Sequence, residues 1–282
     1  MASFLARLRK TPLPQGPEAQ VIGLCRFSYP ALGGFKREHE TPEARAQYLY
    51  ADARLDERFR LFEAFTLPSL RAQTDPDFVF LIVVGQDFPA HRLAQLRALT
   101  AGMPQVVIQA HPPGQHRSVM AEAINSVRKP GVFSIQFRND DDDAVGVSFV
   151  ARLRQVLAES PLLFAAHRHV AVDFTKGHSA RADARGILAE PATQLFLGCG
   201  LALVFRPGVP LTVMNFTHHE VWQHMPTLTF TDPDMYLRGL NDHNDSGDRV
   251  GQNVALLSPD DEARFARAFG ISSERVRAIW KC

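Results

Sequence analysis

Hydrophobic residues in the first half of the chain follow two alternating patterns. Continuous apolar runs, such as Phe78 to Val84, are typical of parallel strands that are covered on both faces. Between these runs, apolar residues recur at intervals of three or four, which predicts helices that bury one side. Strands that alternate with helices predict an α/β fold with an open, mostly parallel sheet flanked by helices. In chain order, the predicted elements are strand 20–27, a helix through Leu55, Phe59, Phe62 and Phe65, strand 78–84, helix 90–101, strand 105–109, helix 117–128 and strand 132–138.

The second half of the chain is less regular. Its apolar runs predict further strands and helices, but the stretch 170–195 carries scattered charges and two glycines, which is typical of a mobile loop or an insertion. In the first half, Pro68 is expected to break or kink the helix that contains it. No internal repeat is present. The elements predicted here are strands 162–166, 200–205 and 227–231, a short helix 220–224, and two closing helices, 258–269 and 272–280.

Composition narrows the class of protein. A hydrophobic content of 45% and a charged content of 22% are those of an ordinary soluble globular protein. The formal net charge of +1 argues against a protein that binds nucleic acid through a strong positive field. The three cysteines, Cys25, Cys199 and Cys282, are far apart, form no disulfide framework and lack zinc-site spacing. We therefore expect a cytoplasmic protein.

The N-terminal segment 1–19 is predicted to be a tail and linker, because Pro12, Pro14, Gly16 and Pro17 precede the first strand. Its apolar part, within residues 1–10, is too short for a secretory signal. The basic residues there allow at most a peripheral contact with a membrane surface.

Four consecutive aspartates, Asp140 to Asp143, follow strand 132–138. Two carboxylates about 6 Å apart repel each other by about 3 kcal/mol at an effective dielectric of 20, so the end of a buried strand needs a cation to offset them. Mg²⁺ and Mn²⁺ prefer oxygen ligands, and Mg²⁺ is usually held by one or two carboxylates together with substrate phosphates. If the chain stays extended, Asp140 and Asp142 point one way and Asp141 and Asp143 the other. The run predicts a metal–phosphate site, with a solvated acidic turn as the alternative.

Two other strand ends carry polar residues. In open α/β sheets, ligands bind beyond the carboxyl ends of the strands. Arg26, Phe27 and Ser28 follow the first strand, and Asp87 follows the second. We therefore expect these residues near the aspartates.

Three separated motifs resemble a known family. They are Ile22-Gly23-Leu24-Cys25-Arg26-Phe27-Ser28, Thr66-Leu67-Pro68-Ser69-Leu70-Arg71-Ala72-Gln73-Thr74 and Gln136-Phe137-Arg138-Asn139-Asp140-Asp141-Asp142-Asp143-Ala144-Val145. In this order they resemble a bacterial family named putative rhamnosyltransferases, which is similar to glycosyltransferases with a GT-A fold, over most of residues 20–260. The resemblance implies one compact domain, in which 20–145 binds a nucleotide sugar and 146–282 faces the acceptor.

The resemblance also implies ligands and residue roles. A nucleotide-sugar donor would meet Mn²⁺ or Mg²⁺ at Asp140 and Asp142, although the sequence does not exclude Asp141 and Asp143. His243 would complete the metal or diphosphate shell, and the acceptor would be a glycan or a surface polysaccharide. The residues expected to contact the donor are Arg26, Phe27, Ser28, Asp87, Asn125, Arg128 and Asp141.

Two segments of the second half have candidate roles on the acceptor side. His218-His219-Glu220 is a source of further catalytic groups, because an inverting transferase needs a carboxylate or an imidazole to remove the proton of the acceptor hydroxyl. Glu220 is expected to be this catalytic base; the alternative is that His218 and Glu220 cap a short helix. Gly198-Cys199-Gly200 resembles the segment that lines the acceptor side in similar enzymes, although a plain turn explains it equally well.

The aspartate run and its surroundings also bear on three other functions. A phosphatase would use Asp141 as nucleophile in an Asp-x-Asp-x-Val motif, but that motif usually opens its domain. A calcium loop counted from Asp141 fails, because Val145 and Arg152 stand where oxygen ligands are required. A non-catalytic sugar-binding protein on the same scaffold stays open, because fold does not fix function.

Overall fold

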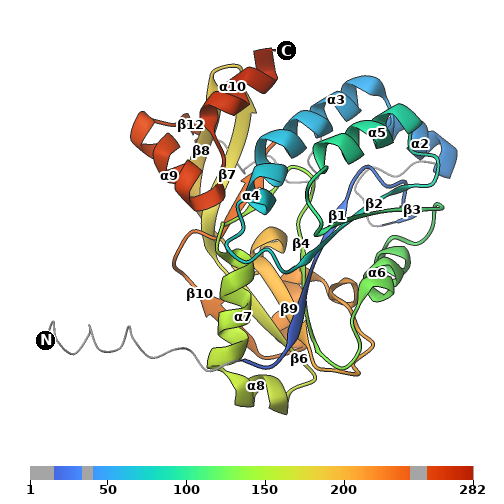
Figure 1. Ribbon diagram of the computed structural model, residues 1–282, viewed down its shortest axis with the longest axis vertical. Coiled ribbons are helices and arrows are strands. Elements are labelled where there is room, and N and C mark those ends of the chain that lie inside the picture. The colour runs from blue at the N-terminus through green and yellow to red at the C-terminus, as the bar shows by residue number, and fades with distance from the viewer. Residues whose placement is uncertain (1–15, 34–40, 242–252, 282) are drawn as a thin grey trace, which may run out of the picture.

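The fold is built on two β-sheets, as seen in a computed structural model that describes residues 16–33, 41–241 and 253–281. The larger sheet has the strand order β10-β6-β9-β4-β1-β2-β3, and the smaller one β12-β8-β7-β11-β5 (Figure 1). The larger sheet contains β1 (Ala19–Arg26), β2 (Val79–Gly85), β3 (Val106–His111), β4 (Phe133–Arg138), β6 (His169–Phe174), β9 (Leu201–Phe205) and β10 (Thr227–Phe230). The smaller contains β5 (Ala144–Val145), β7 (Lys176–Asp183), β8 (Gly186–Thr193), β11 (Tyr236–Gly239) and β12 (Ala255–Leu256).

The larger sheet is mostly parallel, as the sequence predicts. β1 lies at its centre and pairs in parallel with β2 and β4, and β3 extends the parallel part beyond β2. β9 runs antiparallel to its neighbours β4 and β6. The middle parts of β1, β2 and β4 are buried because helices cover both faces of the sheet.

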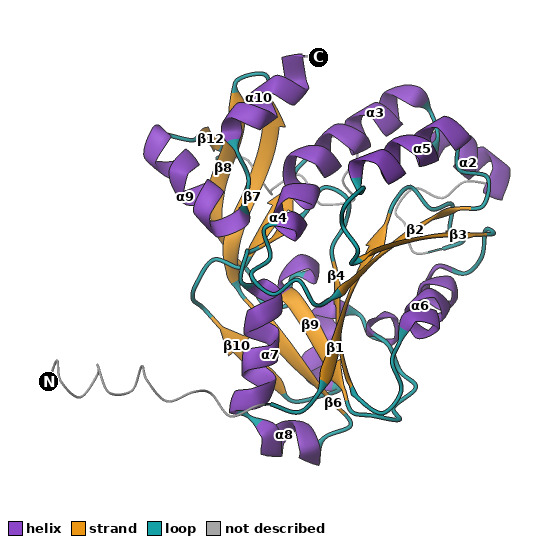
Figure 2. Cartoon of the chain, in the orientation of Figure 1, coloured by secondary structure: helices purple, strands orange, loops and turns teal. Residues whose placement is uncertain are grey.

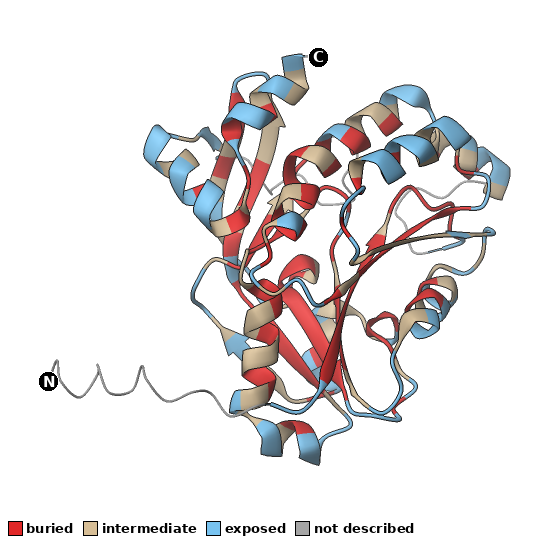
Figure 3. Cartoon of the chain, viewed as in Figure 1, coloured by how far each residue is buried: buried red, intermediate tan, exposed pale blue. Residues whose placement is uncertain are grey.

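The helices are divided between the two faces of the larger sheet (Figure 2). One face packs against α3 (Asp52–Leu61), α5 (Ala90–Leu99) and α7 (Phe149–Glu159), through residues such as Phe59 and Leu153. The other face packs against α6 (His116–Val127), through Met120 and Ile124. The central strands β1, β4, β6 and β9 are largely buried, and the outer sides of α3 and α5 are exposed (Figure 3). The remaining helices are α2 (Pro42–Leu49), α4 (Leu67–Arg71), α8 (Pro161–Ala166), α9 (Pro259–Phe269) and α10 (Ser273–Lys281). Among the described residues, none of the helices has both the length and the apolar character that crossing a bilayer requires.

The helix that contains Pro68 is interrupted before the proline. A π-helical turn, η1 (Phe62–Thr66), joins α3 to α4, and the Leu67 N–H donates to the Phe62 carbonyl five residues back. Pro68 then lies in the first turn of α4, where its missing N–H needs no partner inside the helix. The predicted kink is therefore a π-turn, and the helical segment continues to Arg71.

Two predictions for the second half are wrong. Residues 162–166 belong to the helix α8, which Pro161 opens; Leu162 is 84% exposed, so this apolar run does not mark a buried strand. The stretch 170–195 is not a mobile loop, because it forms β6 and the antiparallel hairpin β7–β8. Its charges sit on a partly exposed sheet, where polar and buried positions alternate. The other predicted strands and helices are confirmed within a few residues.

The middle of β1 requires a glycine. Gly23 pairs with Phe80 of β2 on one side and with Phe137 of β4 on the other. Both rings fold over it, so that a Cβ added at Gly23 would lie 2.5 Å from Phe137 and 2.8 Å from Phe80. The glycine thus allows two phenylalanines to fill the core at one level of the sheet.

We expect Gly23→Ala to lower the free energy of unfolding by about 1–3 kcal/mol, because the rings must leave their rotamers to admit a methyl group. Urea denaturation measures this. Phe80→Leu makes room, so the double variant should lose less than the sum of the two single variants. Additive losses would show that the rings do not restrict position 23.

Candidate functional site

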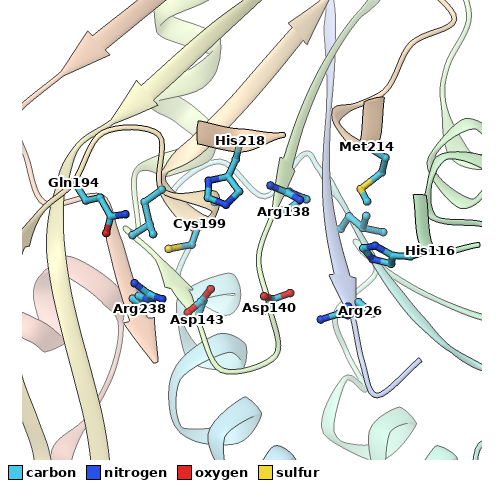
Figure 4. Close-up of a pocket in the computed structure, with 13 residues that line it drawn as sticks. Arg26, His116, Arg138, Asp140, Asp143, Gln194, Cys199, Met214, His218 and Arg238 are labelled. Carbon is cyan, nitrogen blue, oxygen red and sulfur yellow. The ribbon is translucent and has the colours of Figure 1, made fainter. Parts of the chain in front are cut away.

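A cavity of about 400 Å³ lies where β1 and β4 end (Figure 4). Arg26 is the last residue of β1 and Arg138 the last of β4, and the two strands are parallel neighbours. Arg238 of β11 lies on the same cavity, so both sheets contribute. The expectation that polar residues after β1 and β4 meet at one edge of the sheet is confirmed. The polar lining comprises Arg26, His116, Arg138, Asp140, Asp143, Gln194, His218 and Arg238.

The four aspartates form a turn and not an extended segment. The Asp143 N–H donates to the Asp140 carbonyl at 3.2 Å, which closes a turn over four residues. Thr66 Oγ1 and Asn139 Nδ2 both donate to the Asp143 carbonyl, at 2.7 and 3.1 Å. As a result Asp140 and Asp143, three positions apart, both line the cavity. The alternation expected for an extended chain, with Asp140 beside Asp142, does not occur.

Asp141 and Asp142 are held away from the cavity by Arg58 of α3. The Arg58 Nε donates to Asp141 Oδ2 at 2.9 Å, and its two terminal nitrogens contact Asp142 at 3.2 and 3.3 Å. Asn241 Nδ2 also donates to Asp142, at 2.6 Å. All three charged side chains are buried, at 9%, 3% and 6% exposure for Arg58, Asp141 and Asp142. Burial disfavours the charged form of Arg58, but Asp142 and Asp140 outweigh it and the pKa of Arg58 is raised.

We expect Arg58→Met to lower the free energy of unfolding by about 3–5 kcal/mol at neutral pH, because it leaves two buried carboxylates without a counter-charge. Thermal or urea unfolding measures the loss.

Arg60→Met on the exposed side of the same helix is the matched control and should change stability little. Equal stability of the Arg58 and Arg60 variants would contradict the role given to the buried ion pair.

Asp143 is tied to the smaller sheet. The Gly239 N–H of β11 donates to Asp143 Oδ1 at 3.0 Å, and a Cβ at Gly239 would lie 2.0 Å from the Asp142 carbonyl oxygen. Burial, followed by the charges of Asp142 and Asp140, raises the pKa of Asp143 well above its ordinary value. A cation placed beside Asp143 would therefore stabilise its carboxylate form.

The arginines make the cavity attractive to anions. Arg138 is half-buried, and its guanidinium makes no hydrogen bond or ion pair with any residue that the structure describes. Burial lowers the pKa of Arg138, and the charge of Asp140 opposes this effect. Burial and the charges of Arg26 and Arg138 lower the pKa of His116 to about 3, so its imidazole is neutral.

A segment with unusual backbone geometry borders the cavity. Phe196 has a positive φ of 55°, and its peptide groups are fixed on two sides. Its N–H donates to Asp173 Oδ1 at 3.1 Å, and its carbonyl lies 2.6 Å from His218 Nδ1. Because a carbonyl oxygen only accepts hydrogen bonds, Nδ1 of His218 carries the proton. Asp173 Oδ2 is buried without a hydrogen-bond partner among the described residues, and burial raises the pKa of Asp173 to about 6.

The raised pKa of Asp173 predicts a pH dependence of stability. Its contribution is fully present below the unfolded pKa of about 3.9 and is lost as pH rises through about 6, a change of about 2–3 kcal/mol. Asp173→Asn keeps the acceptor for the Phe196 N–H but removes the titration.

The Asn variant should therefore gain stability relative to the unmodified protein between pH 4.5 and 7.5, as measured by urea unfolding. Asp260→Asn, at an exposed position of α9, serves as control. If the difference in free energy of unfolding between the Asp173 variant and the unmodified protein stayed constant across this pH range, the raised pKa of Asp173 would be contradicted.

Of the residues predicted to form the site, Arg26 and Asp140 meet in the cavity. Phe27 lies in the core against Phe59, and Ser28 is buried and accepts a hydrogen bond from Arg54 at 3.0 Å. Asp87 lies on a second, smaller cavity. The structure brings neither Phe27 nor Ser28 into the main cavity.

The predicted residues of α6 and the second half are also separated from the cavity. Asn125 and Arg128 lie at the far end of α6 from His116, and Arg128 donates to the Leu211 carbonyl at 3.1 Å. Glu220 does not line the cavity; its side chain is 47% exposed and lies 4.0 Å from His219. His243 falls outside the described residues, as do residues 1–10 with their predicted membrane contact.

Some cavity residues were not expected from the sequence, such as Arg238 of β11 and His116, which begins α6. His218, which was named with Glu220 as a source of catalytic groups, begins the 3₁₀-helix η4 (His218–Gln223) and lines the cavity. Gly198 and Cys199 also line the cavity, and their place on the acceptor side stays a prediction. If residues 140–143 had been interpreted as a turn and not as an extended segment, Asp140 and Asp143 would have been expected on the same side.

The donor atoms at the cavity suit a hard divalent cation. The described part of the chain contains no group of three or more His, Cys, Asp or Glu residues placed to hold a metal. Asp140 and Asp143 supply two carboxylates. Two carboxylates are enough to hold Mg²⁺ or Mn²⁺ when phosphate oxygens of a substrate supply the remaining ligands.

Comparison with protein families identifies the chain. The model of the family described as "Putative rhamnosyl transferase" matches residues 20–253. The chain belongs to this family. It is accordingly a glycosyltransferase, and the resemblance drawn from the three sequence motifs is confirmed. No curated protein matches the chain.

Solved structures show a distant likeness to TarS of S. aureus. TarS 1–349 in complex with UDP-GlcNAc is 9% identical with a TM-score of 0.41, over 93% of this chain and 70% of that one. TarS 1–349 without a named ligand is 8% identical with a TM-score of 0.40, over 78% and 60%. A further TarS structure is 8% identical with a TM-score of 0.41, over 79% and 37%.

Proposed function

We propose that this glycosyltransferase takes a sugar from a nucleoside diphosphate sugar and binds the diphosphate at Asp140, Asp143 and Arg138. The description of its family makes rhamnose the proposed sugar. The observation that carries the proposal is the pairing of two carboxylates with three arginines in one cavity at the carboxyl edge of a mostly parallel sheet.

The charges favour a diphosphate over a neutral sugar. Three guanidinium groups and two carboxylates line the cavity, and the pKa of Asp143 is raised, so positive charge prevails. Arg138 has donors available for phosphate oxygens, and a planar guanidinium can bind such oxygens through two hydrogen bonds at once. His116 is neutral and adds no charge.

Divalent metal dependence is part of the proposal. Asp140 and Asp143 would hold Mn²⁺ or Mg²⁺, in place of the Asp140 and Asp142 pair expected from the sequence. When bound, such a cation stabilises the negative charge of a departing diphosphate as a Lewis acid. The arginines orient the same phosphates and exclude water from them.

The nucleoside has a candidate position in a second cavity at the same edge of the larger sheet. A second cavity of about 210 Å³ is lined by Asp87 and Tyr50, among others, beyond the ends of β1, β2 and β3. The Tyr50 hydroxyl is buried without a hydrogen-bond partner among the described residues, and burial together with Asp87 raises the pKa of Tyr50 to about 12. A nucleobase would offer acceptors to this hydroxyl and donors to Asp87.

The phosphatase alternative is not favoured, because Asp141 is buried and paired with Arg58 and cannot attack a substrate. A glycan or surface-polysaccharide acceptor stays a prediction. The cytoplasmic location, which rests on the few cysteines, also stays a prediction.

The arrangement predicts that metal and diphosphate bind together. Two carboxylates alone hold Mn²⁺ weakly, so Mn²⁺ alone should raise the melting temperature little. Mn²⁺ with thymidine or uridine diphosphate should raise it by more than the separate effects combined, since a ligand at 100 times its Kd contributes about 2.7 kcal/mol.

Thermal unfolding with these ligands also tests the residues. Asp140→Asn and Asp143→Asn should lose the effect of Mn²⁺, and Arg138→Gln should weaken the effect of the nucleoside diphosphate. Asp260→Asn should behave as the unmodified protein. If the melting-temperature shift caused by the diphosphate were the same with and without Mn²⁺ in every variant, the proposed metal site would be contradicted. If no nucleotide raised the melting temperature, the proposed function would be contradicted.

A further inference from the structure

His218 is a basic group on the cavity that the proposed binding of donor and metal does not use. It begins η4 (His218–Gln223), and its ring is directed into the cavity near Arg138 and Cys199 (Figure 4). We propose that His218 is the general base that removes the proton from the acceptor hydroxyl during sugar transfer. This inference rests on the proposed function and assigns its acceptor side.

The structure fixes which nitrogen of His218 can act. Nδ1 donates its proton to the Phe196 carbonyl at 2.6 Å. The Phe196 peptide is itself held by Asp173, so the acceptor of this bond does not move freely. Nε2, on the other side of the ring, therefore carries the lone pair. A neutral imidazole with one nitrogen committed to a carbonyl is oriented to take up a proton at the other.

The surroundings keep the imidazole neutral. Burial lowers the pKa of His218, the bond to Phe196 opposes this, and the charges of Arg138, His219 and Arg238 lower it further. The other titratable groups on the same cavity are Arg26, His116, Asp140, Asp143 and Cys199. The unprotonated form, which is the form a base requires, therefore prevails at neutral pH.

Glu220, the base expected from the sequence, is poorly placed for this step. In a 3₁₀-helix with three residues per turn, residues two positions apart point to different sides. His218 and Val221 are one turn apart, and Val221 is fully buried, so this side of η4 faces the interior. Glu220 is 47% exposed on another side.

The proposed step balances in bonds and charge. The acceptor O–H bond breaks and its proton goes to Nε2 of His218. The acceptor oxygen forms a bond to the anomeric carbon of the sugar, while the bond from that carbon to the diphosphate oxygen breaks and its electron pair leaves with the nucleoside diphosphate. The positive charge gained by His218 is offset by the negative charge gained by the diphosphate beside Arg138. Nε2 later releases the proton to solvent.

The test uses His218→Asn, because Asn Nδ2 can still donate to the Phe196 carbonyl while no base remains. The measured reaction is release of nucleoside diphosphate from thymidine or uridine diphosphate rhamnose with Mn²⁺ and water as acceptor. We expect a 10²- to 10⁴-fold loss of turnover, with the melting-temperature shift by nucleoside diphosphate and Mn²⁺ retained. Turnover of the unmodified enzyme should fall on the acid side, at a pH below the ordinary histidine range because the pKa of His218 is lowered by burial, and this fall should be absent from the residual activity of the variant.

His219→Asn and Glu220→Gln are the matched controls and should keep near-normal turnover. His218→Gln is a second variant without a base, and the melting temperature of each variant shows whether it folds. Normal turnover of folded His218→Asn, or collapse of Glu220→Gln alone, overturns the assignment of His218 but not the proposed function. Absence of turnover and of nucleotide stabilisation in the unmodified protein overturns both.

Discussion

The ion pair of Arg58 with Asp141 and Asp142 determines what the aspartate turn presents to the cavity. Four adjacent carboxylates at a strand end repel one another, and Arg138, the nearest cationic residue in the sequence, forms no ion pair with them in the described part of the chain. The fold supplies the partner cation from α3, more than 80 residues earlier, where Arg58 is bonded to both middle aspartates. Only the outer pair, Asp140 and Asp143, then remains for a ligand.

The π-turn in the helical segment 52–71 contributes to the same arrangement. Arg58 lies before this turn, and Thr66, within it, donates to the Asp143 carbonyl at 2.7 Å. One helical segment thus holds both the side chains and the backbone of the aspartate turn. Because Leu61 and Phe65 of this segment pack in the core of the smaller sheet while Phe59 packs on the larger, the turn is fixed where the two sheets meet.

The cavity has a charged region and a region with a neutral histidine. Arg26, Arg138 and the two aspartates form an electrostatic centre suited to phosphate and a divalent cation. Around Phe196, by contrast, backbone groups hold a neutral histidine. In Figure 4, Arg26 and His116 lie at one end of the cavity and Gln194 and Arg238 at the other, with Asp140, Arg138 and His218 between them.

The sequence alone predicts the sheet edge and the family, but not the details of the site. Unbroken apolar runs and their helical spacers locate β1, β2 and β4, and parallel pairing then brings Arg26 to Asp140. The partner of Asp141 and Asp142 was not predictable, because Arg58 is far away in sequence and looks like any arginine of a surface helix. The hairpin β7–β8 was missed because its half-exposed sheet mixes charges with apolar residues. His218 was passed over for Glu220 because only the fold shows which side of η4 faces the cavity.

The most direct test is a crystal structure of the protein with Mn²⁺ and a nucleoside diphosphate, in which anomalous scattering locates the metal. The account predicts one manganese peak about 2.0–2.2 Å from carboxylate oxygens of Asp140 and Asp143, with a phosphate of the ligand against Arg138. A peak at Asp141 and Asp142 with Arg58 displaced, or a diphosphate bound away from this cavity, would contradict it.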